Sequence, residues 1–291
     1  MARVVFVHGV GRQRETEHTL HAEEAPALCG GVQLAGGQLV PDQVRCPCYG
    51  DLFRPAGRPL AVGDPLVRAE DLDAFERDLL MQWWRAAART DPGVLPPDAR
   101  TLARTPRSVQ AGLRALSGSR FFAAAGERAL LASLRQVRDY LHQPAVRLEA
   151  RRRVADSVAE DTRVLVGHSL GSVLAYEALC ANPRWTVRVL VTLGSPLGIP
   201  NLIFDRLQPA PRAPAQAGSG PRGHWPGEGR SWTNVADEGD VVALVKDLRP
   251  MFGRQLRGWI VHNGAHAHRA KPYLTAVETG RAILAGLDGD Q

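Results

Sequence analysis

The sequence Gly-His-Ser-Leu-Gly at residues 167–171 lies between two segments of different character. Residues 163–166 form an apolar, β-branched run typical of a buried strand, and residues 172–180 continue with helical spacing. A strand that turns directly into a helix crowds the residue at the corner, and glycines two positions before and after it let the backbones pass. The motif therefore predicts a nucleophile elbow, with Ser169 at the carboxyl edge of a sheet. A Gly/Ser turn without chemistry is the alternative, and the flanking strand and helix disfavour it.

A second strand is predicted at residues 3–7, which are dense in β-branched side chains and run directly into His-Gly-Val-Gly at 8–11. Glycines at the end of a strand leave backbone N–H groups at the carboxyl edge of the sheet. An oxyanion hole must lie there if Ser169 is a nucleophile. We expect the N–H groups of Val10 and Leu170 to form it, whereas the motif taken alone is also compatible with an ordinary glycine turn.

Two later loops carry candidates for the acid and the base that a serine nucleophile requires. A neutral imidazole must take the serine proton, and a carboxylate must orient that imidazole and stabilise its charge. Apolar runs predict further strands at 187–193, 232–235 and 259–262. The candidates that follow the last two of these strands are, in chain order, Asp237, Glu238, Asp240, His266 and His268.

From the first predicted strand to a closing helix at 275–287, apart from an inserted segment at 52–125 and a Pro/Gly-rich loop at 209–230, the chain resembles an α/β-hydrolase of the serine esterase and lipase type. The resemblance implies an α/β fold, with a mostly parallel sheet flanked by helices on both faces. In this family the acid commonly follows a pattern like Trp-x-Asn, a short loop and Asp-Pro-Val. The matching residues here are Trp232, Asn234 and Asp240, with Val241 in place of the proline. The match favours Asp240 as the acid and leaves Asp237 as the alternative.

The family's histidine often precedes a Tyr-Leu pair by about five positions. This spacing fits His268 before Tyr273, and His266 is the alternative base. The resemblance implies that His168 packs and that His8 braces the oxyanion loop. It also implies an acyl-enzyme mechanism that needs neither a metal nor an organic cofactor.

The domain organisation follows from the length of the segment between a strand predicted at 44–49 and the nucleophile strand. Residues 52–162 are far more than one crossover helix needs. Helical spacing recurs there in two apolar stripes, Leu72, Phe75, Leu79 and Trp83, and then Leu130, Leu134, Val137 and Leu141. We therefore expect a single α/β-hydrolase domain over 1–291, with a helical cap inserted at 52–125 and a flexible Pro/Gly-rich loop at 209–230.

The charge balance does not predict nucleic-acid binding. The net charge is +6, but only Lys246 and Lys271 are lysines among the 36 basic residues. The arginines are scattered without aromatic interleaving, which indicates a solvated surface. We expect no nucleic-acid partner.

The four cysteines are Cys29, Cys46, Cys48 and Cys180. Cys46-Pro47-Cys48 is too short for a zinc knuckle and has no second pair, so no metal is expected. Free thiols, the lack of a signal-peptide pattern and the lack of an apolar run of about 18 residues predict a cytoplasmic protein.

The sequence therefore predicts a serine hydrolase that cleaves a small-molecule or lipid-like carboxylic ester. Acyl transfer or cyclisation with the same triad is an alternative, because pocket shape selects the acceptor. A non-catalytic binding module with the same fold is another. Trp83 and Trp84 in the cap either line an apolar substrate cleft or belong to the core. A lipid-like substrate would bring the protein to a membrane surface, so peripheral membrane contact is a further alternative.

Overall fold

The computed structural model describes residues 2–54, 68–97, 106–119, 126–213 and 220–288. These residues form an α/β fold around one six-stranded sheet in which all paired strands run parallel, in the order β2-β1-β3-β4-β5-β6. The strands are β1 (Val4–Val7), β2 (Val44–Arg45), β3 (Val164–His168), β4 (Val189–Leu193), β5 (Ser231–Asp237) and β6 (Arg257–Val261). The predicted α/β class and parallel sheet are confirmed.

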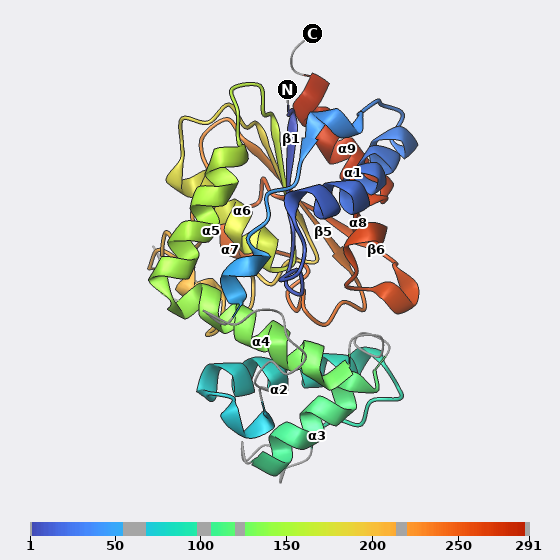
Figure 1. The fold of residues 1–291 in the computed structure, drawn as a ribbon, viewed down its shortest axis with the longest axis vertical. Coiled ribbons are helices and arrows are strands. Elements are labelled where there is room, and N and C mark those ends of the chain that lie inside the picture. The colour runs from blue at the N-terminus through green and yellow to red at the C-terminus, as the bar shows by residue number, and fades with distance from the viewer. Residues whose placement is uncertain (1, 55–67, 98–105, 120–125, 214–219, 289–291) are drawn as a thin grey trace.

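Helices cover both faces of the sheet (Figure 1). One face packs against α1 (Glu17–Leu34), α8 (Ala270–Leu274) and α9 (Val277–Leu287). The other packs against α5 (Pro144–Ser157) and α6 (Leu170–Ala181). Because alternate residues of a strand point to opposite faces and both faces are covered, the central strands are apolar at nearly every position, with His168 and Thr192 as polar exceptions. They are accordingly buried along their whole length.

Three helices lie beyond the carboxyl ends of the strands, at the opposite end of the molecule from both termini (Figure 1). They are α2 (Ala74–Thr90), α3 (Pro106–Ser117) and α4 (Gly126–His142), which pack against one another. Trp83 and Trp84 on α2 are 3% and 4% exposed, and the Trp84 indole donates a hydrogen bond to the carbonyl of Leu95 at 2.8 Å. Both rings belong to the hydrophobic core, so the structure favours core packing over a cleft-lining role.

Parts of the predicted cap and of the predicted Pro/Gly-rich loop lie outside the described residues. These are 55–67, 98–105 and 120–125 of the helical cap, and 214–219 of the Pro/Gly-rich loop. On either side of 214–219, Arg212 and Arg222 pair antiparallel through backbone hydrogen bonds of 2.7 and 3.0 Å.

One predicted strand was too long, and one helix was not predicted. The strand predicted at 44–49 ends at Arg45, because Pro47 has no N–H for the sheet and the N–H of Tyr49 is bonded to the His8 ring. Helix α1 had no clear signal, since it contains Pro26 and a Gly30-Gly31 pair. A Cβ on Gly31 would lie 2.1 Å from the carbonyl oxygen of Leu274, so close packing against α8 explains the glycine.

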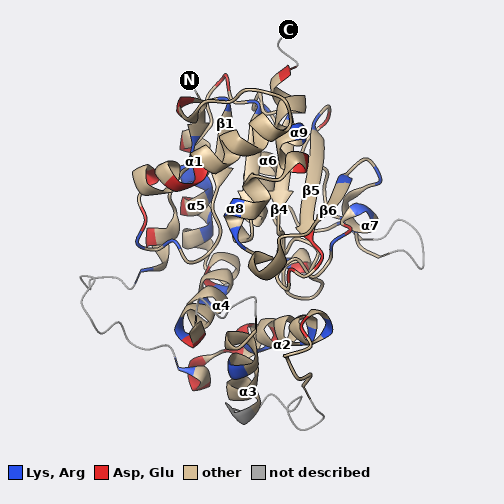
Figure 2. Ribbon diagram, turned by 90° about the vertical axis from the view of Figure 1, so that its right-hand side faces the viewer, with Lys and Arg blue, Asp and Glu red and all other residues tan. Residues whose placement is uncertain are grey.

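Helix α4 carries both acidic and basic side chains (Figure 2), whereas the charged side chains of α1 are Glu17, Glu23 and Glu24. Several form ion pairs, such as Arg12 with Glu23 and Glu24 at 2.6 Å each. None of the helices among the described residues combines the length and the apolarity that crossing a bilayer would require.

Candidate active site

Ser169 lies at the sharp turn between β3 and α6, with φ 54° and ψ −128°. A positive φ is strained for a residue with a side chain, and such residues concentrate at functional sites. A Cβ on Gly167 would lie 2.5 Å from the carbonyl oxygen of Gly171, and one on Gly171 would lie 2.2 Å from that of His8. Both flanking positions therefore require glycine. The local geometry is that of a nucleophile elbow.

Ser169, His268 and Asp240 form a continuous chain of hydrogen bonds. The Nε2 atom of His268 is 3.0 Å from the Oγ atom of Ser169, and its Nδ1 atom is 2.8 Å from Oδ2 of Asp240. Because a charged carboxylate only accepts, the ring proton belongs on Nδ1, and Nε2 is left to accept from the serine hydroxyl. Asp240 and Ser169 are 2% and 3% exposed, and the His268 side chain is 17% exposed.

The Asp240 carboxylate is satisfied on both oxygens. Its Oδ1 accepts from the backbone N–H groups of Val242 and Ala243 at 2.8 and 3.3 Å, while Oδ2 accepts from His268 and from the Tyr273 hydroxyl at 2.8 Å each. Burial by itself would raise the pKa of Asp240, but His268 and the other donors outweigh it, and the net pKa is lowered. Asp240 is therefore charged at neutral pH.

Tyr273 has a role that was not predicted from the sequence, where it served only to mark the position of His268. Its hydroxyl donates to Asp240 and accepts from the backbone N–H of Asp237 at 2.7 Å. Burial, followed by the charge of Asp240, raises the pKa of Tyr273, so the hydroxyl keeps the proton that it donates. The only sequence signal was the Tyr-Leu spacing.

The alternative acid, Asp237, lies outside this chain of hydrogen bonds. Its Oδ1 accepts from the N–H of Gly239 at 2.8 Å, and its Oδ2 accepts from the N–H of Asn263. It thus ties together the loops that follow β5 and β6. The alternative base, His266, has an exposed side chain in a short turn, Gly264–His266. The structure brings together Ser169, Asp240 and His268 and leaves these two residues aside.

His8 braces the loop after β1. Its Nδ1 lies 2.7 Å from the Gly9 carbonyl, its Nε2 lies 3.3 Å from the Tyr49 N–H, and its ring stacks on that of Tyr49 at 4.1 Å. Burial lowers the pKa of His8 to about 4, so the ring is neutral and donates from Nδ1 to Gly9. The Gly9 carbonyl and the Val10 N–H belong to one planar peptide. His8 therefore fixes the direction of the Val10 N–H.

His168, within the elbow, is also neutral. Burial and then the proximity of His268 lower the pKa of His168 to about 3. Its Nε2 lies 3.0 Å from the carbonyl oxygen of His268, to which it donates. His168 thus packs beneath the site and holds the His268 backbone.

The two predicted oxyanion donors border Ser169. Leu170 begins α6, so its N–H has no acceptor within the helix, and the helix end favours negative charge. A Cβ on Gly9 would lie 2.8 Å from the Cβ of Ser169, which places Gly9, the residue before Val10, directly against Ser169.

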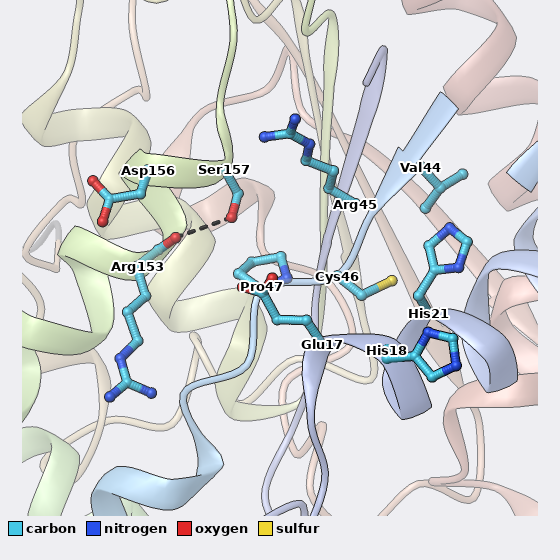
Figure 3. A pocket seen from close by; sticks show the side chains of 10 residues that line it. All are labelled: Glu17, His18, His21, Val44, Arg45, Cys46, Pro47, Arg153, Asp156 and Ser157. Carbon is cyan, nitrogen blue, oxygen red and sulfur yellow. Dashed lines mark hydrogen bonds between the residues drawn. The ribbon is translucent and has the colours of Figure 1, made fainter. Parts of the chain in front are cut away.

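A pocket of about 560 Å³ lies away from this constellation, between α1, the end of β2 and α5 (Figure 3). Its polar lining includes Glu17, His18, His21, Arg45, Cys46 and Arg153, and none of Ser169, Asp240 and His268. Burial raises the pKa of the Cys46 thiol to about 12. In the described part of the chain, no three His, Cys, Asp or Glu side chains are grouped to hold a metal ion.

A scan against protein-family models found no match, and a search of curated proteins found no similar sequence. Among solved structures, the chain is similar to dienelactone hydrolase from Anabaena variabilis ATCC 29413. The two are 14% identical over 98% of this chain and 87% of that one, with a TM-score of 0.37. The fold is therefore assigned from the arrangement of the strands and helices of this chain. The order of the parallel sheet, the elbow between β3 and α6, and helices on both faces give this chain the α/β-hydrolase fold.

Proposed function

We propose that this protein is a serine hydrolase that cleaves a carboxylic ester with Ser169 as nucleophile, His268 as base and Asp240 as the acid. The observation that carries the proposal is the unbroken path from Ser169 Oγ to His268 at 3.0 Å and on to Asp240 at 2.8 Å. The three residues also follow one another in the chain order that this fold uses.

In the first half-reaction, His268 Nε2 takes the hydroxyl proton as Ser169 Oγ attacks the ester carbonyl. The tetrahedral intermediate carries a negative oxygen, which the N–H groups of Leu170 and Val10 stabilise. The imidazolium that forms is held by charged Asp240, whose lowered pKa keeps it from taking the proton itself.

In the second half of the cycle, the protonated His268 gives its proton to the leaving alcohol, and an acyl-enzyme forms on Ser169. Water then attacks this ester with His268 again as base, and His268 returns that proton to Ser169 Oγ as the carboxylic acid is released. The chemistry of this cycle uses only side chains and backbone N–H groups of this chain.

The direct test is the turnover of a series of p-nitrophenyl esters of increasing acyl length. Wild-type protein should release p-nitrophenol continuously, and Ser169→Ala should lower kcat by at least about 10³-fold. Ser157→Ala is the matched control, because Ser157 is also buried but lies on α5, where it donates to the Arg153 carbonyl at 3.1 Å. It should keep wild-type kcat. Equal turnover by wild type and Ser169→Ala would contradict the proposal. Mass analysis of the products formed with added alcohol would distinguish acyl transfer to the alcohol from hydrolysis.

A further inference from the structure

Gln136 is a buried polar residue on α4, one of the three helices beyond the carboxyl ends of the strands. It is 2% exposed, yet both ends of its amide are satisfied. Its Nε2 donates to the Ala132 carbonyl one turn earlier at 3.0 Å, and its Oε1 accepts from the backbone N–H of Gly11 at 3.0 Å. Because only the amide oxygen can accept, the donation from Nε2 to Ala132 leaves Oε1 facing the N–H of Gly11.

Gly11 ends the loop that carries the proposed oxyanion donor. Its φ of +87° is one that glycine adopts readily, and its N–H belongs to the peptide that joins Val10 to Gly11. The preceding peptide, from Gly9 to Val10, is held at its carbonyl by the Nδ1–H of His8 at 2.7 Å. Val10 therefore lies between two peptides that are each fixed by a buried side chain.

We propose that Gln136 is a positioning residue for the oxyanion hole, acting through Gly11 to hold the Val10 N–H toward the reacting carbonyl. This inference rests on the proposed function. His8 restrains the peptide that contains the donor, and Gln136 restrains the next one, so rotation of the backbone at Val10 is opposed from both sides. A hydrogen-bond donor stabilises the oxyanion most when it is already oriented before the negative charge develops.

The contact also joins two regions that are 125 residues apart in sequence. Helix α4 packs against α2 and α3, and its apolar side chains continue into the core that lies under β1 and α6. The helices between β2 and β3 thus contribute a side chain to the geometry of the site.

The activity test uses two truncations, Gln136→Met and Gln136→Ala, both compatible with a helix. Each should lower kcat for a p-nitrophenyl ester by about 10- to 100-fold, less than the loss of a donor outright, with KM changed by less than about threefold. Affinity for a trifluoromethyl ketone, which forms an oxyanion on the serine, should fall by the same factor as kcat/KM.

The matched control is Gln110→Met on α3, which removes a side-chain hydrogen bond to Glu127 of 3.1 Å but touches no part of the loop. It should keep wild-type kcat and ketone affinity. Hydrogen exchange of the Gly11 amide supplies a readout without substrate, because this amide should be protected in wild type and exposed in both truncations.

The outcomes separate this inference from the proposed function. Wild-type protein without esterase turnover would contradict the proposed function itself. Normal wild-type turnover together with unchanged kcat and ketone affinity in a folded Gln136 truncation would overturn only the positioning role. A Gly11 amide that exchanges freely in wild type would overturn it as well.

Discussion

Tyr273 and His268 donate hydrogen bonds to the same oxygen of Asp240, each at 2.8 Å. The other oxygen is held by backbone N–H groups at Val242 and Ala243, so the carboxylate cannot rotate without losing bonds on both sides. The orientation of the His268 ring therefore depends on a tyrosine hydroxyl that does not touch Nε2, the ring nitrogen facing Ser169.

Replacing Tyr273 by phenylalanine should lower kcat about tenfold, because a hydrogen bond to a charged group is lost. Without the Tyr273 hydroxyl, the Asp240 carboxylate attracts the His268 ring more strongly, and the protonated imidazole becomes more stable. The acidic limb of the pH dependence of kcat/KM should consequently move to higher pH. Steady-state kinetics between about pH 5 and pH 9 measure both effects.

Tyr140→Phe is the control for this prediction. The Tyr140 hydroxyl is also buried and donates to a carboxylate, Glu177, at 2.7 Å, but outside the site. This variant should lose stability and keep the wild-type pH profile. If Tyr273→Phe showed the same behaviour as Tyr140→Phe, the hydroxyl would have no influence on the acid.

The two candidate bases should separate clearly in kinetics. His268→Ala removes the group 3.0 Å from Ser169 Oγ and should lower kcat by at least about 10³-fold. His266→Ala removes an exposed side chain and should stay within about twofold of wild type. Initial rates on a short p-nitrophenyl ester decide this, and the reverse ranking would move the base to His266.

The two candidate acids should differ in what they lose. Asp240→Asn cannot hold the His268 ring in the same tautomer, so kcat should fall by about 10³-fold or more while the fold is kept. Asp237→Asn weakens the bonds to the loop amides of Gly239 and Asn263 and should cost about 1–3 kcal/mol of unfolding free energy. Its kcat should change little. Urea unfolding and initial rates on both variants make the comparison, and a large kcat loss confined to Asp237→Asn would contradict the assignment.

Two buried histidines make the stability of the fold depend on pH. The pKa of His8 is lowered to about 4 and that of His168 to about 3, chiefly by burial, whereas the ordinary value is 6.5. Below pH 6.5 these two histidines therefore bind protons in the unfolded chain that they do not bind in the folded chain, and their contribution to stability falls as the pH falls. From about pH 7 to about pH 5, each histidine should remove about 2 kcal/mol of unfolding free energy.

Urea unfolding at these two pH values checks the histidine contribution. His8→Asn keeps a donor near Gly9 but does not titrate, so its loss of stability on acidification should be about 2 kcal/mol smaller than that of wild type. An identical pH dependence in wild type and His8→Asn would mean that His8 is not held neutral by the fold.

The elbow and the strands around it could be predicted because their signals are local. An apolar run followed by a glycine-flanked serine is constrained by sterics within a few residues, as the close contacts at Gly167 and Gly171 show. The order of the acid and the base followed from the resemblance to the α/β-hydrolases. Helix α1 could not be predicted, because its stability depends on how Gly31 packs against α8 and α9.

The contacts of Gln136 and Tyr273 could not be predicted from the sequence either. In the sequence, Gln136 looks like any polar residue on a helix. The contact that distinguishes it is the hydrogen bond from the N–H of Gly11, 125 positions away. Tyr273 likewise donates a hydrogen bond to Asp240, 33 positions away. Such contacts depend on how the elements are placed in space, which local periodicity does not encode.

The most direct measurement is covalent labelling with a fluorophosphonate probe, followed by mass analysis of the intact protein and of the peptide that contains Ser169. Wild type and Ser157→Ala should each gain one adduct, located on Ser169. Labelling should be greatly slowed in His268→Ala and absent in Ser169→Ala. A wild-type protein that stays unlabelled, or a Ser169→Ala variant that labels at the wild-type rate, would contradict the assignment of Ser169 as an activated nucleophile.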